Sequence, residues 1–292
     1  MKLGIDIGNY NVNTSENIMF KACISNHKEF GSYCDKLVYE GKAHYIGEGK
    51  LEIDYRKFDK SNYLPLLLAA ICKSCTHEEV EIGVGLPLTQ YKENRNELTN
   101  MLNSKEFKVE FNGVSRRVKI VKATVFPEGI ASYVSSNEKL KGFVQGRDVV
   151  VVDIGGGTTD ISLIRGRKAL KSTSVNKGTI DIYNAIKIAL EEKYFDINIS
   201  IDNIQMYIDR GFWYKGEKQD ISFAIKRSND IFKEIYNELK LNYPINTEAV
   251  VLAGGGSDLL LKVFKNKINS IAVDDDLYAN AKGFKILMNS LC

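Results

Sequence analysis

Two stretches of the chain place an aspartate at the end of an apolar strand, with glycine and small polar residues directly after it. The first reads Gly4-Ile5-Asp6-Ile7-Gly8-Asn9-Tyr10. The second reads Val149 to Val152, followed by Asp153-Ile154-Gly155-Gly156-Gly157-Thr158-Thr159-Asp160. Glycine lets the backbone approach a ligand and turn several N–H groups toward one anion. The two stretches therefore predict two turns that hold a polyphosphate from opposite sides.

A third glycine turn, Gly254-Gly255-Gly256-Ser257, follows an apolar strand and leads into an expected helix. A helix N-terminus attracts anions because its first N–H groups have no partner inside the helix. We expect the hydroxyl of Ser257 to cap this helix. Glycine after a strand is also common in ordinary tight turns, so each turn taken alone leaves that simpler reading open.

The two aspartates need a cation, because a carboxylate repels phosphate. Mg²⁺ is often held by one or two carboxylates, several waters and phosphate oxygens. We therefore predict that Asp6 and Asp153 bind Mg²⁺ through water from the two sides of a cleft. The alternative is that each aspartate only caps its own turn by bonding local amides.

The elements around these turns repeat between the two halves of the chain, because each half begins with three strands and continues with helices. The expected strands lie at 2–7, 18–25 and 36–39, and again at 149–153, 160–165 and 169–175. The expected helices lie at 63–75, 89–102, 127–135, 179–192, 201–210 and 221–241, with a last one from about Asp276. The Gly- and charge-rich segment 142–147 is the expected crossing between the halves. This pattern predicts an α/β fold made of a duplicated domain, with a cleft between the copies.

The composition is that of an ordinary globular protein. The chain has 292 residues, of which 44% are hydrophobic and 26% are charged, and its net charge is +3. That charge gives no reason to expect nucleic acid or a membrane as a direct partner. No signal segment and no apolar run of spanning length is visible. We therefore expect a cytoplasmic protein.

The segment Cys72-Lys73-Ser74-Cys75, with His77 after it, has two readings. It could supply half of a zinc site, but zinc needs further ligands at metal spacing and no second pair is present. It also lies at the end of the helix expected at 63–75, where free cysteines commonly act as small buried hydrophobic residues. The sequence favours buried thiols.

The order of the motifs resembles the actin, Hsp70 and sugar kinase superfamily, and more closely its ParM family of bacterial plasmid-segregation ATPases. The resemblance covers nearly the whole chain, and the turn after Asp153 is specific to the superfamily. The segments that carry the resemblance to the ParM branch are Gly85–Tyr91, Val125–Tyr133, Val150–Ser162, Val250–Asp258 and Asp275–Gly283.

The resemblance implies an actin-like ATPase fold, with two duplicated ribonuclease H-like domains around a nucleotide cleft. Domain I would span 1–145 and domain II 146–275, and a C-terminal helix at 276–292 would return to domain I. The bound ligand would be ATP or GTP with Mg²⁺.

The resemblance also implies roles for single residues. Asp6, Asp153 and Glu128 would be catalytic, with Glu128 orienting the water that attacks the γ-phosphate. Taken by itself, Glu128 can also be an acid favoured by the dipole of a helix that Pro127 opens. The nucleotide would contact the three glycine turns and the start of the helix after Lys177, namely Gly8, Asn9, Tyr10, Gly155, Gly156, Gly157, Thr158, Thr159, Gly178, Gly254, Gly255, Gly256 and Ser257.

One position departs from the family, which has a lysine at the place of Asn13. Either Lys21 or a backbone amide would then have to neutralise the outer phosphate.

The function implied by the resemblance is a nucleotide-dependent ATPase that forms head-to-tail filaments and segregates plasmid DNA. A separate DNA-binding adaptor would grip the plasmid, with no direct contact to nucleic acid or membrane. Two other readings stay open: a sugar or small-molecule kinase of the same superfamily, and another actin-like cytoskeletal protein.

Overall fold

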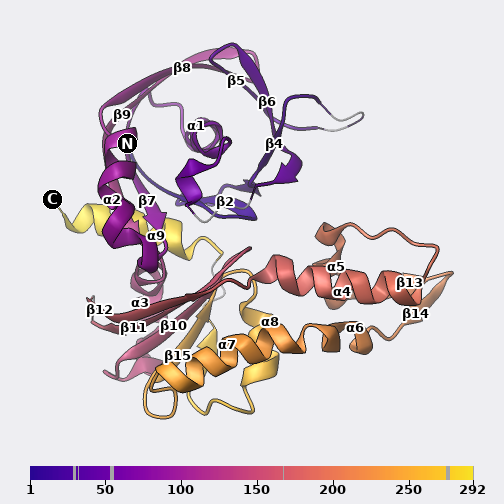
Figure 1. The fold of residues 1–292 in the computed structure, drawn as a ribbon. Helices are drawn as coiled ribbons and strands as arrows, with labels where there is room; N and C mark the ends of the chain where they lie inside the picture. Colours follow the sequence, from indigo (N-terminus) through magenta and orange to yellow (C-terminus); the bar gives the residue numbers. More distant parts are fainter. Residues whose placement is uncertain (29–30, 32, 53–55, 167, 274–276, 292) are drawn as a thin grey trace.

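The computed structural model describes residues 1–28, 31, 33–52, 56–166, 168–273 and 277–291. These residues form two large β-sheets with helices packed against them (Figure 1). The expected start of the last helix at Asp276, the neighbouring Asp275, and the turn at Arg167 lie outside the described residues.

The first sheet has nine strands in the order β3-β2-β1-β7-β9-β8-β5-β6-β4. It curls around helix α1 (Tyr63–Ser74), as Figure 1 shows. All residues of α1 from Leu66 to Ile71 are buried, which is typical of a helix enclosed by its own core. The strands are β1 (Lys2–Ile7), β2 (Asn11–Thr14), β3 (Met19–Lys21), β4 (Cys23–Ser25), β5 (Lys36–Tyr39), β6 (Lys42–Leu51), β7 (Glu79–Leu86), β8 (Lys105–Phe111) and β9 (Val114–Pro127). The short helix η1 (Lys57–Asp59) precedes α1, and α2 (Leu88–Leu102) follows β7.

The second sheet has five strands in the order β12-β11-β10-β15-β16. Its central strand β10 is buried along its whole length, because helices cover both of its faces. Val149 and Val151 pack with α3, whereas Val150 and Val152 pack with α4, α7 and α8 on the other face. The strands are β10 (Val149–Ile154), β11 (Thr159–Arg165), β12 (Lys168–Val175), β15 (Ala249–Ala253) and β16 (Ile271–Val273).

Most of the remaining elements cover the second sheet or extend from it, whereas the last helix, α9, packs on strands of the first sheet. They are α3 (Ile130–Val144), α4 (Thr179–Lys193), η2 (Ile201–Asn203), α5 (Ile204–Arg210), β13 (Phe212–Tyr214), β14 (Glu217–Gln219), α6 (Ser222–Arg227), α7 (Asn229–Asn242), α8 (Ser257–Phe264) and α9 (Ala279–Ser290).

The two sheets share one topology, which confirms the predicted duplication. In each sheet the first three strands in sequence form an antiparallel meander, β1-β2-β3 and β10-β11-β12. Two further strands then add in parallel beside the first, namely β7 and β9 in one sheet and β15 and β16 in the other. The first sheet alone continues beyond this unit, through β8, β5, β6 and β4.

Helix α9 lies between the two sheets, where it packs on β1 and α3 (Figure 1, yellow). Glycines allow the closest contacts. A Cβ atom on Gly4 would lie 1.9 Å from the carbonyl oxygen of Ala281, and a Cβ atom on Gly283 would lie 1.9 Å from that of Ala131. Because no side chain fits at these two positions, both glycines fix how closely α9 approaches the elements on either side.

The helix predicted to start at Pro127 starts at Ile130 instead. Strand β9 runs through Pro127, and the N–H of Glu128 still donates to the carbonyl of Leu86 on β7 at 2.9 Å. Gly129 then adopts a φ of +73°, which turns the chain into α3. Glu128 therefore precedes the helix, and its reading as a first-turn acid is wrong.

Other expected elements change their limits. Helix α3 continues through Gly142 to Val144, so the crossing is shorter than 142–147 and begins with Gln145 in the left-handed conformation. The helix expected at 221–241 is two helices that meet at Ser228, whose hydroxyl donates to the carbonyl of Ile225. The predicted strand 18–25 is divided into β3 and β4, and the sequence did not predict β2, β13, β14 or β16.

Within the described ranges, no helix is both long enough and apolar enough to span a bilayer. Cys72 and Cys75 are buried at the end of α1 and carry free thiols. The guanidinium of Arg116 donates to the backbone carbonyls of both residues.

Candidate functional site

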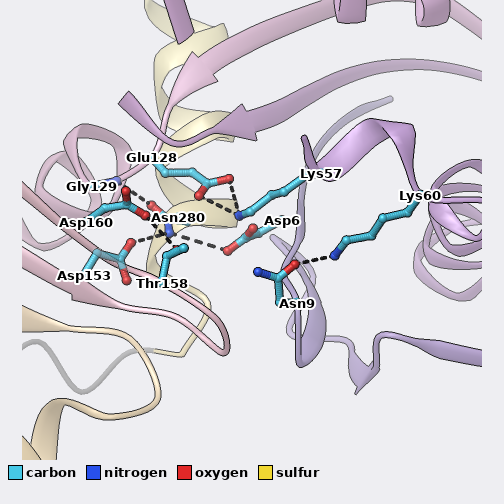
Figure 2. Close-up of polar contacts among 10 residues, drawn as sticks. All are labelled: Asp6, Asn9, Lys57, Lys60, Glu128, Gly129, Asp153, Thr158, Asp160 and Asn280. Atoms are coloured by element: carbon cyan, nitrogen blue, oxygen red, sulfur yellow. Dashed lines mark hydrogen bonds and ion pairs between the residues drawn. The ribbon is translucent and has the colours of Figure 1, made fainter. Parts of the chain in front are cut away.

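The ends of β1 and β10, which carry Asp6 and Asp153, meet at a narrow cleft between the two sheets (Figure 2). The cleft has a cavity volume of about 120 Å³, well below the roughly 300–1,000 Å³ of common ligand pockets. The two sheets are therefore close together in this arrangement. The predicted site residues that line the cleft are Asp6, Gly8, Asn9, Tyr10, Glu128, Asp153, Gly155, Gly156, Thr158, Gly254 and Gly255.

The remaining predicted residues lie beside the cleft rather than in its lining. Gly157 lines an adjoining cavity, and Gly178 packs on the backbone of the turn at 155–156. The buried hydroxyl of Thr159 donates to the carbonyl of Lys177. Gly256 and Ser257 are at the start of α8.

The predicted capping role of Ser257 is wrong. Gly256 is the N-cap residue of α8, and Ser257 is the first residue of the helix, with no side-chain bond that caps it. The N–H of Ser257 instead donates to the carbonyl of Gly254 at 3.2 Å, which closes the turn with backbone atoms alone.

The first two glycine turns have the same internal geometry. The N–H of Gly8 donates to the carbonyl of Asn11 at 2.9 Å, and the N–H of Gly155 donates to the carbonyl of Thr158 at 2.9 Å. Each turn links the first two strands of its sheet. The turns also touch, because a Cβ atom on Gly156 would lie 2.9 Å from the Cβ of Tyr10. Two equivalent backbone loops thus face each other across the cleft.

Asn280, near the start of α9, connects the two aspartates. Its Nδ2 donates to Oδ2 of Asp153 at 2.9 Å and lies 3.5 Å from Oδ2 of Asp6. Its Oδ1 accepts a bond from the N–H of Gly129 at 3.2 Å. Figure 2 shows the amide between the two carboxylates, close to the turn that carries Glu128.

Among the described residues, the lining of the cleft carries an excess of negative charge. It includes the carboxylates of Asp6, Glu128, Asp153 and Asp160, and Lys57 is its one ammonium group. Burial raises the pKa of Asp153 to about 6, and the carboxylates of Asp6 and Asp160 add to this rise while the bond from Asn280 opposes it. Burial also raises the pKa of Asp160. The carboxylates of the cleft would attract a cation that enters it.

Lys57 reaches the cleft from η1 and pairs with Glu128. Its Nζ lies 2.8 Å from Oε1 and 2.7 Å from Oε2 of Glu128, and both side chains are buried. Burial alone would lower the pKa of Lys57, but the facing carboxylates of Glu128 and Asp6 raise it above its usual value. Burial raises the pKa of Glu128, and the Lys57 ammonium opposes this rise.

The carboxylates suit Mg²⁺ held through water. Oδ1 of Asp6 and Oδ1 of Asp160 are buried without a hydrogen-bond partner, so each has an acceptor that a metal-bound water would satisfy. No group of three carboxylate, thiol or imidazole side chains among the described residues is close enough to chelate an ion directly.

Asp202, in η2, joins the second half of the chain to residues of the first half at the rim of the cleft. The hydroxyl of Tyr10 donates to its Oδ1 at 2.7 Å, and Nζ of Lys21 lies 2.5 Å from its Oδ2. Burial would raise the pKa of Asp202, but Lys21 and Tyr10 hold it below its ordinary value. Lys21 is thus engaged at the rim and does not line the cleft.

Sequence reasoning missed three residues of the site: Lys57, Asp160 and Asn280. Asp160 ends the quoted motif after Asp153, so its position in that motif was an available signal. Asn280 lies in the 275–283 segment that resembles the ParM family. Lys57 carried no local signal, because its place in the cleft depends on the path of the chain before α1.

Two family models match most of the chain. Residues 4–130 match the model described as Actin like proteins N terminal domain. Residues 151–266 match the model described as Archaeal actin homologue MreB-like, C-terminal. No curated protein matches the chain.

Solved structures of actin-like proteins share the fold over the full length. The archaeal actin homolog Ta0583 in complex with ADP has a TM-score of 0.82 and 19% identity, with 99% of each chain covered. The 15-stranded ParM filament from Clostridium botulinum has a TM-score of 0.78 and 20% identity, again with 99% of each chain covered. The Alp12 filament structure has a TM-score of 0.68 and 20% identity, covering 100% of this chain and 99% of that one.

The predicted two-domain actin-like fold is confirmed by these structures and by the repeated sheet topology. Since actin-like family models match both halves and the fold is shared throughout, the chain belongs to the actin-like proteins, among which it is similar to ParM proteins and archaeal actin homologues.

Proposed function

We propose that this protein is an ATPase that hydrolyses ATP to ADP and phosphate and assembles into actin-like filaments under nucleotide control. The observation that carries the proposal is the pair of matching turns after Asp6 and Asp153, which touch at Tyr10 and Gly156. A polyphosphate between them would receive N–H groups from two domains at once. The nucleotide would then favour the closed domain arrangement, and its hydrolysis would weaken that preference.

The nucleotide would be held by the residues predicted from the sequence. Some of these residues would contact the phosphates and others the adenosine. The phosphates would lie against Gly8, Asn9, Tyr10 and the turn at 155–159, and the adenosine near Gly178 and the turn at 254–257. Asp6 and Asp153 would hold Mg²⁺ through water, and the ion would neutralise phosphate charge. GTP would use the same phosphate contacts and differ only at the base.

Glu128 is the residue that we propose to orient the attacking water. Its carboxylate enters the cleft beside Asp6 and points toward Lys57 (Figure 2). Phosphoryl transfer depends mostly on positioning and charge stabilisation, so one well-placed carboxylate is sufficient. Glu128→Ala should lower phosphate release per filament on the order of 100-fold, while assembly with Mg·ATP persists. Unchanged phosphate release per filament would refute this role.

The filament is proposed from the fold and from its relatives, two of which were solved as filaments. A head-to-tail contact between identical subunits gives an open polymer when its rotation does not close. We propose that this polymer moves plasmid DNA in the bacterial cytoplasm through a separate DNA-binding adaptor, with no membrane partner. The net charge of +3 gives the protein little general attraction for DNA.

The domain limits 1–145, 146–275 and 276–292 belong to the same proposal. The α9 contacts with β1 support a return of the last segment to domain I. Helix α3 lies before residue 145 in sequence but packs on the second sheet, so it would connect the two domains.

The proposal is tested by light scattering and phosphate release, recorded together after Mg·ATP is added to the purified protein. Scattering should rise and then fall as phosphate appears, and Mg·ADP should give little or no rise. Flat scattering at every protein concentration would refute the filament. Phosphate transfer that requires an added sugar would identify a kinase of the same superfamily instead.

A further inference from the structure

Lys57 is a buried cation that forms an ion pair with Glu128 in the cleft. Its side chain and that of Glu128 are both largely removed from solvent, and each oxygen of Glu128 accepts a bond from Nζ. A buried ion pair contributes little net stability, because the desolvation of both charges offsets their attraction. We therefore ask which other groups Lys57 and Glu128 could bind in this cleft.

The position of Lys57 is at the phosphate end of the cleft. Lys57, Asn9 and Thr158 are the residues shared between the lining of the cleft and that of the adjoining cavity. Asn9 belongs to the first glycine turn and Thr158 to the second. The ammonium thus lies where the two phosphate-binding turns converge, rather than near Gly254 and Gly255.

Other lysines close to the turns are differently engaged. Lys60 donates to Oδ1 of Asn9, and Lys21 pairs with Asp202 at the rim. Among the described residues that line the cleft, Lys57 is the cationic side chain. A highly charged anion placed between the turns would therefore meet Lys57 first.

Such an anion would compete with Glu128. An ammonium has three N–H donors, and a terminal phosphate offers several strong acceptor oxygens with more charge than one carboxylate. Exchange costs little desolvation, because Lys57 is already buried and only changes its partner. Glu128 would then be free to accept a bond from water.

We propose that Lys57 recognises the terminal phosphate of a nucleoside triphosphate and that it does so by exchanging Glu128 for that phosphate. The inference rests on the proposed ATPase function. It states how the bound nucleotide would control whether Glu128 can bind water at the same site. When a diphosphate is bound, Lys57 remains paired with Glu128. Glu128 therefore becomes available to bind water only when the third phosphate is present.

The test compares affinities for Mg·ADP and for a non-hydrolysable Mg·ATP analogue, measured by calorimetry on the full chain. In Lys57→Met, affinity for the triphosphate analogue should fall about 10- to 100-fold, the value of one charge-assisted bond, and affinity for ADP should change little. Lys92→Met, which removes the same charge from the exposed face of α2, should change neither. Equal losses for both nucleotides, or no loss, would overturn the inference.

A second variant predicts the opposite sign, so the test does not depend on the folding of Lys57→Met. Glu128→Gln removes the charged competitor and should raise the ratio of triphosphate to diphosphate affinity several-fold, although hydrolysis is lost. An unchanged or lower ratio would contradict the exchange.

A third variant tests the place of the charge. Asn13 lines the same cleft from β2, is paired in register with Asp6, and its buried Oδ1 has no partner. Asn13→Lys in the Lys57→Met background should restore most of the lost triphosphate affinity. Failure of the wild type to bind either nucleotide would refute the proposed function itself, whereas wild-type binding with no selective effect in these variants would refute only the role of Lys57.

Discussion

Asn280 Nδ2 lies 2.9 Å from Oδ2 of Asp153, and the same amide reaches Oδ2 of Asp6 at 3.5 Å. One side chain from α9 thus contacts two equivalent carboxylates, one on the first strand of each sheet. The bond from Gly129 N–H to Oδ1 of Asn280 requires that Nδ2 faces the aspartates. A neutral amide donor therefore lies between the two carboxylates.

Asn280→Ala should weaken the binding of Mg·nucleotide by about 10-fold, because two buried carboxylates lose a shared donor. Calorimetric titration with Mg·ADP measures the effect. Asn289→Ala changes the same residue type at an exposed site on α9 and should leave binding unchanged. Equal affinities in the two variants would show that the amide does not position the aspartates.

Asp153→Asn should make the nucleotide-free protein more stable while it weakens Mg·nucleotide binding. Burial raises the pKa of Asp153 from 3.8 to about 6, so the ionised carboxylate costs folding free energy at neutral pH. The variant should gain about 1–3 kcal/mol at pH 7.5. The gain should shrink as the pH falls from about 6 to 4, because the wild-type carboxyl then takes up its proton in the folded state.

Urea unfolding with EDTA at pH 7.5 and at pH 4 measures this gain. A variant that is less stable than the wild type at pH 7.5 would contradict the charge argument, since Asn can still accept the bond from Asn280 Nδ2.

Asp202→Asn should speed nucleotide dissociation, because it breaks the ion pair with Lys21 and weakens the bond from Tyr10 across the rim. The pair is partly exposed, so the expected effect is roughly two- to fivefold in rate. Stopped-flow displacement of a fluorescent nucleotide gives the rate. Asp230→Asn removes an exposed pair with Lys233 inside one helix and should not change it.

Gly283→Ala should destabilise the protein by several kcal/mol, since the new Cβ would lie 1.9 Å from the carbonyl oxygen of Ala131 and α9 would have to move. Gly142→Ala is the matched control inside helix α3. Nothing lies within 4 Å of its Cβ position, so it should stabilise by about 0.5–1 kcal/mol. Thermal unfolding of the two variants should therefore shift in opposite directions.

The elements that local patterns define could be predicted from the sequence. Strand β1 was expected at its observed limits, because a short apolar run ends at a Gly-Asn turn. Strand β2, Asn11-Val12-Asn13-Thr14, was missed because it has little strand propensity of its own and depends on its pairing with β1. The start of α3 was misplaced because Pro127 fits a helix start as well as a strand end.

The residues of the site also fall into those that could be predicted from the sequence and those that could not. The glycine turns could be predicted, because each is a motif of consecutive residues. The Lys57–Glu128 pair joins positions that are 71 residues apart, and Asn280 reaches Asp6 over 274 residues. No spacing rule connects such residues, so only the folded chain shows that they meet.

The place of α9 has a consequence for the order in which the protein is made. Synthesis proceeds from the N-terminus, so the chain has completed the first two glycine turns, Glu128 and the turn at 254–255 before Asn280 is added. Until then, Asp6 and Asp153 have no shared donor, and Gly4 and Ala131 have no helix to pack against. A nascent chain can fold its two sheets one after the other, and the contacts of α9 with β1 and α3 form last. Under the proposed function, a chain still in synthesis would lack the amide that contacts both aspartates, so it would bind nucleotide less tightly than the finished chain.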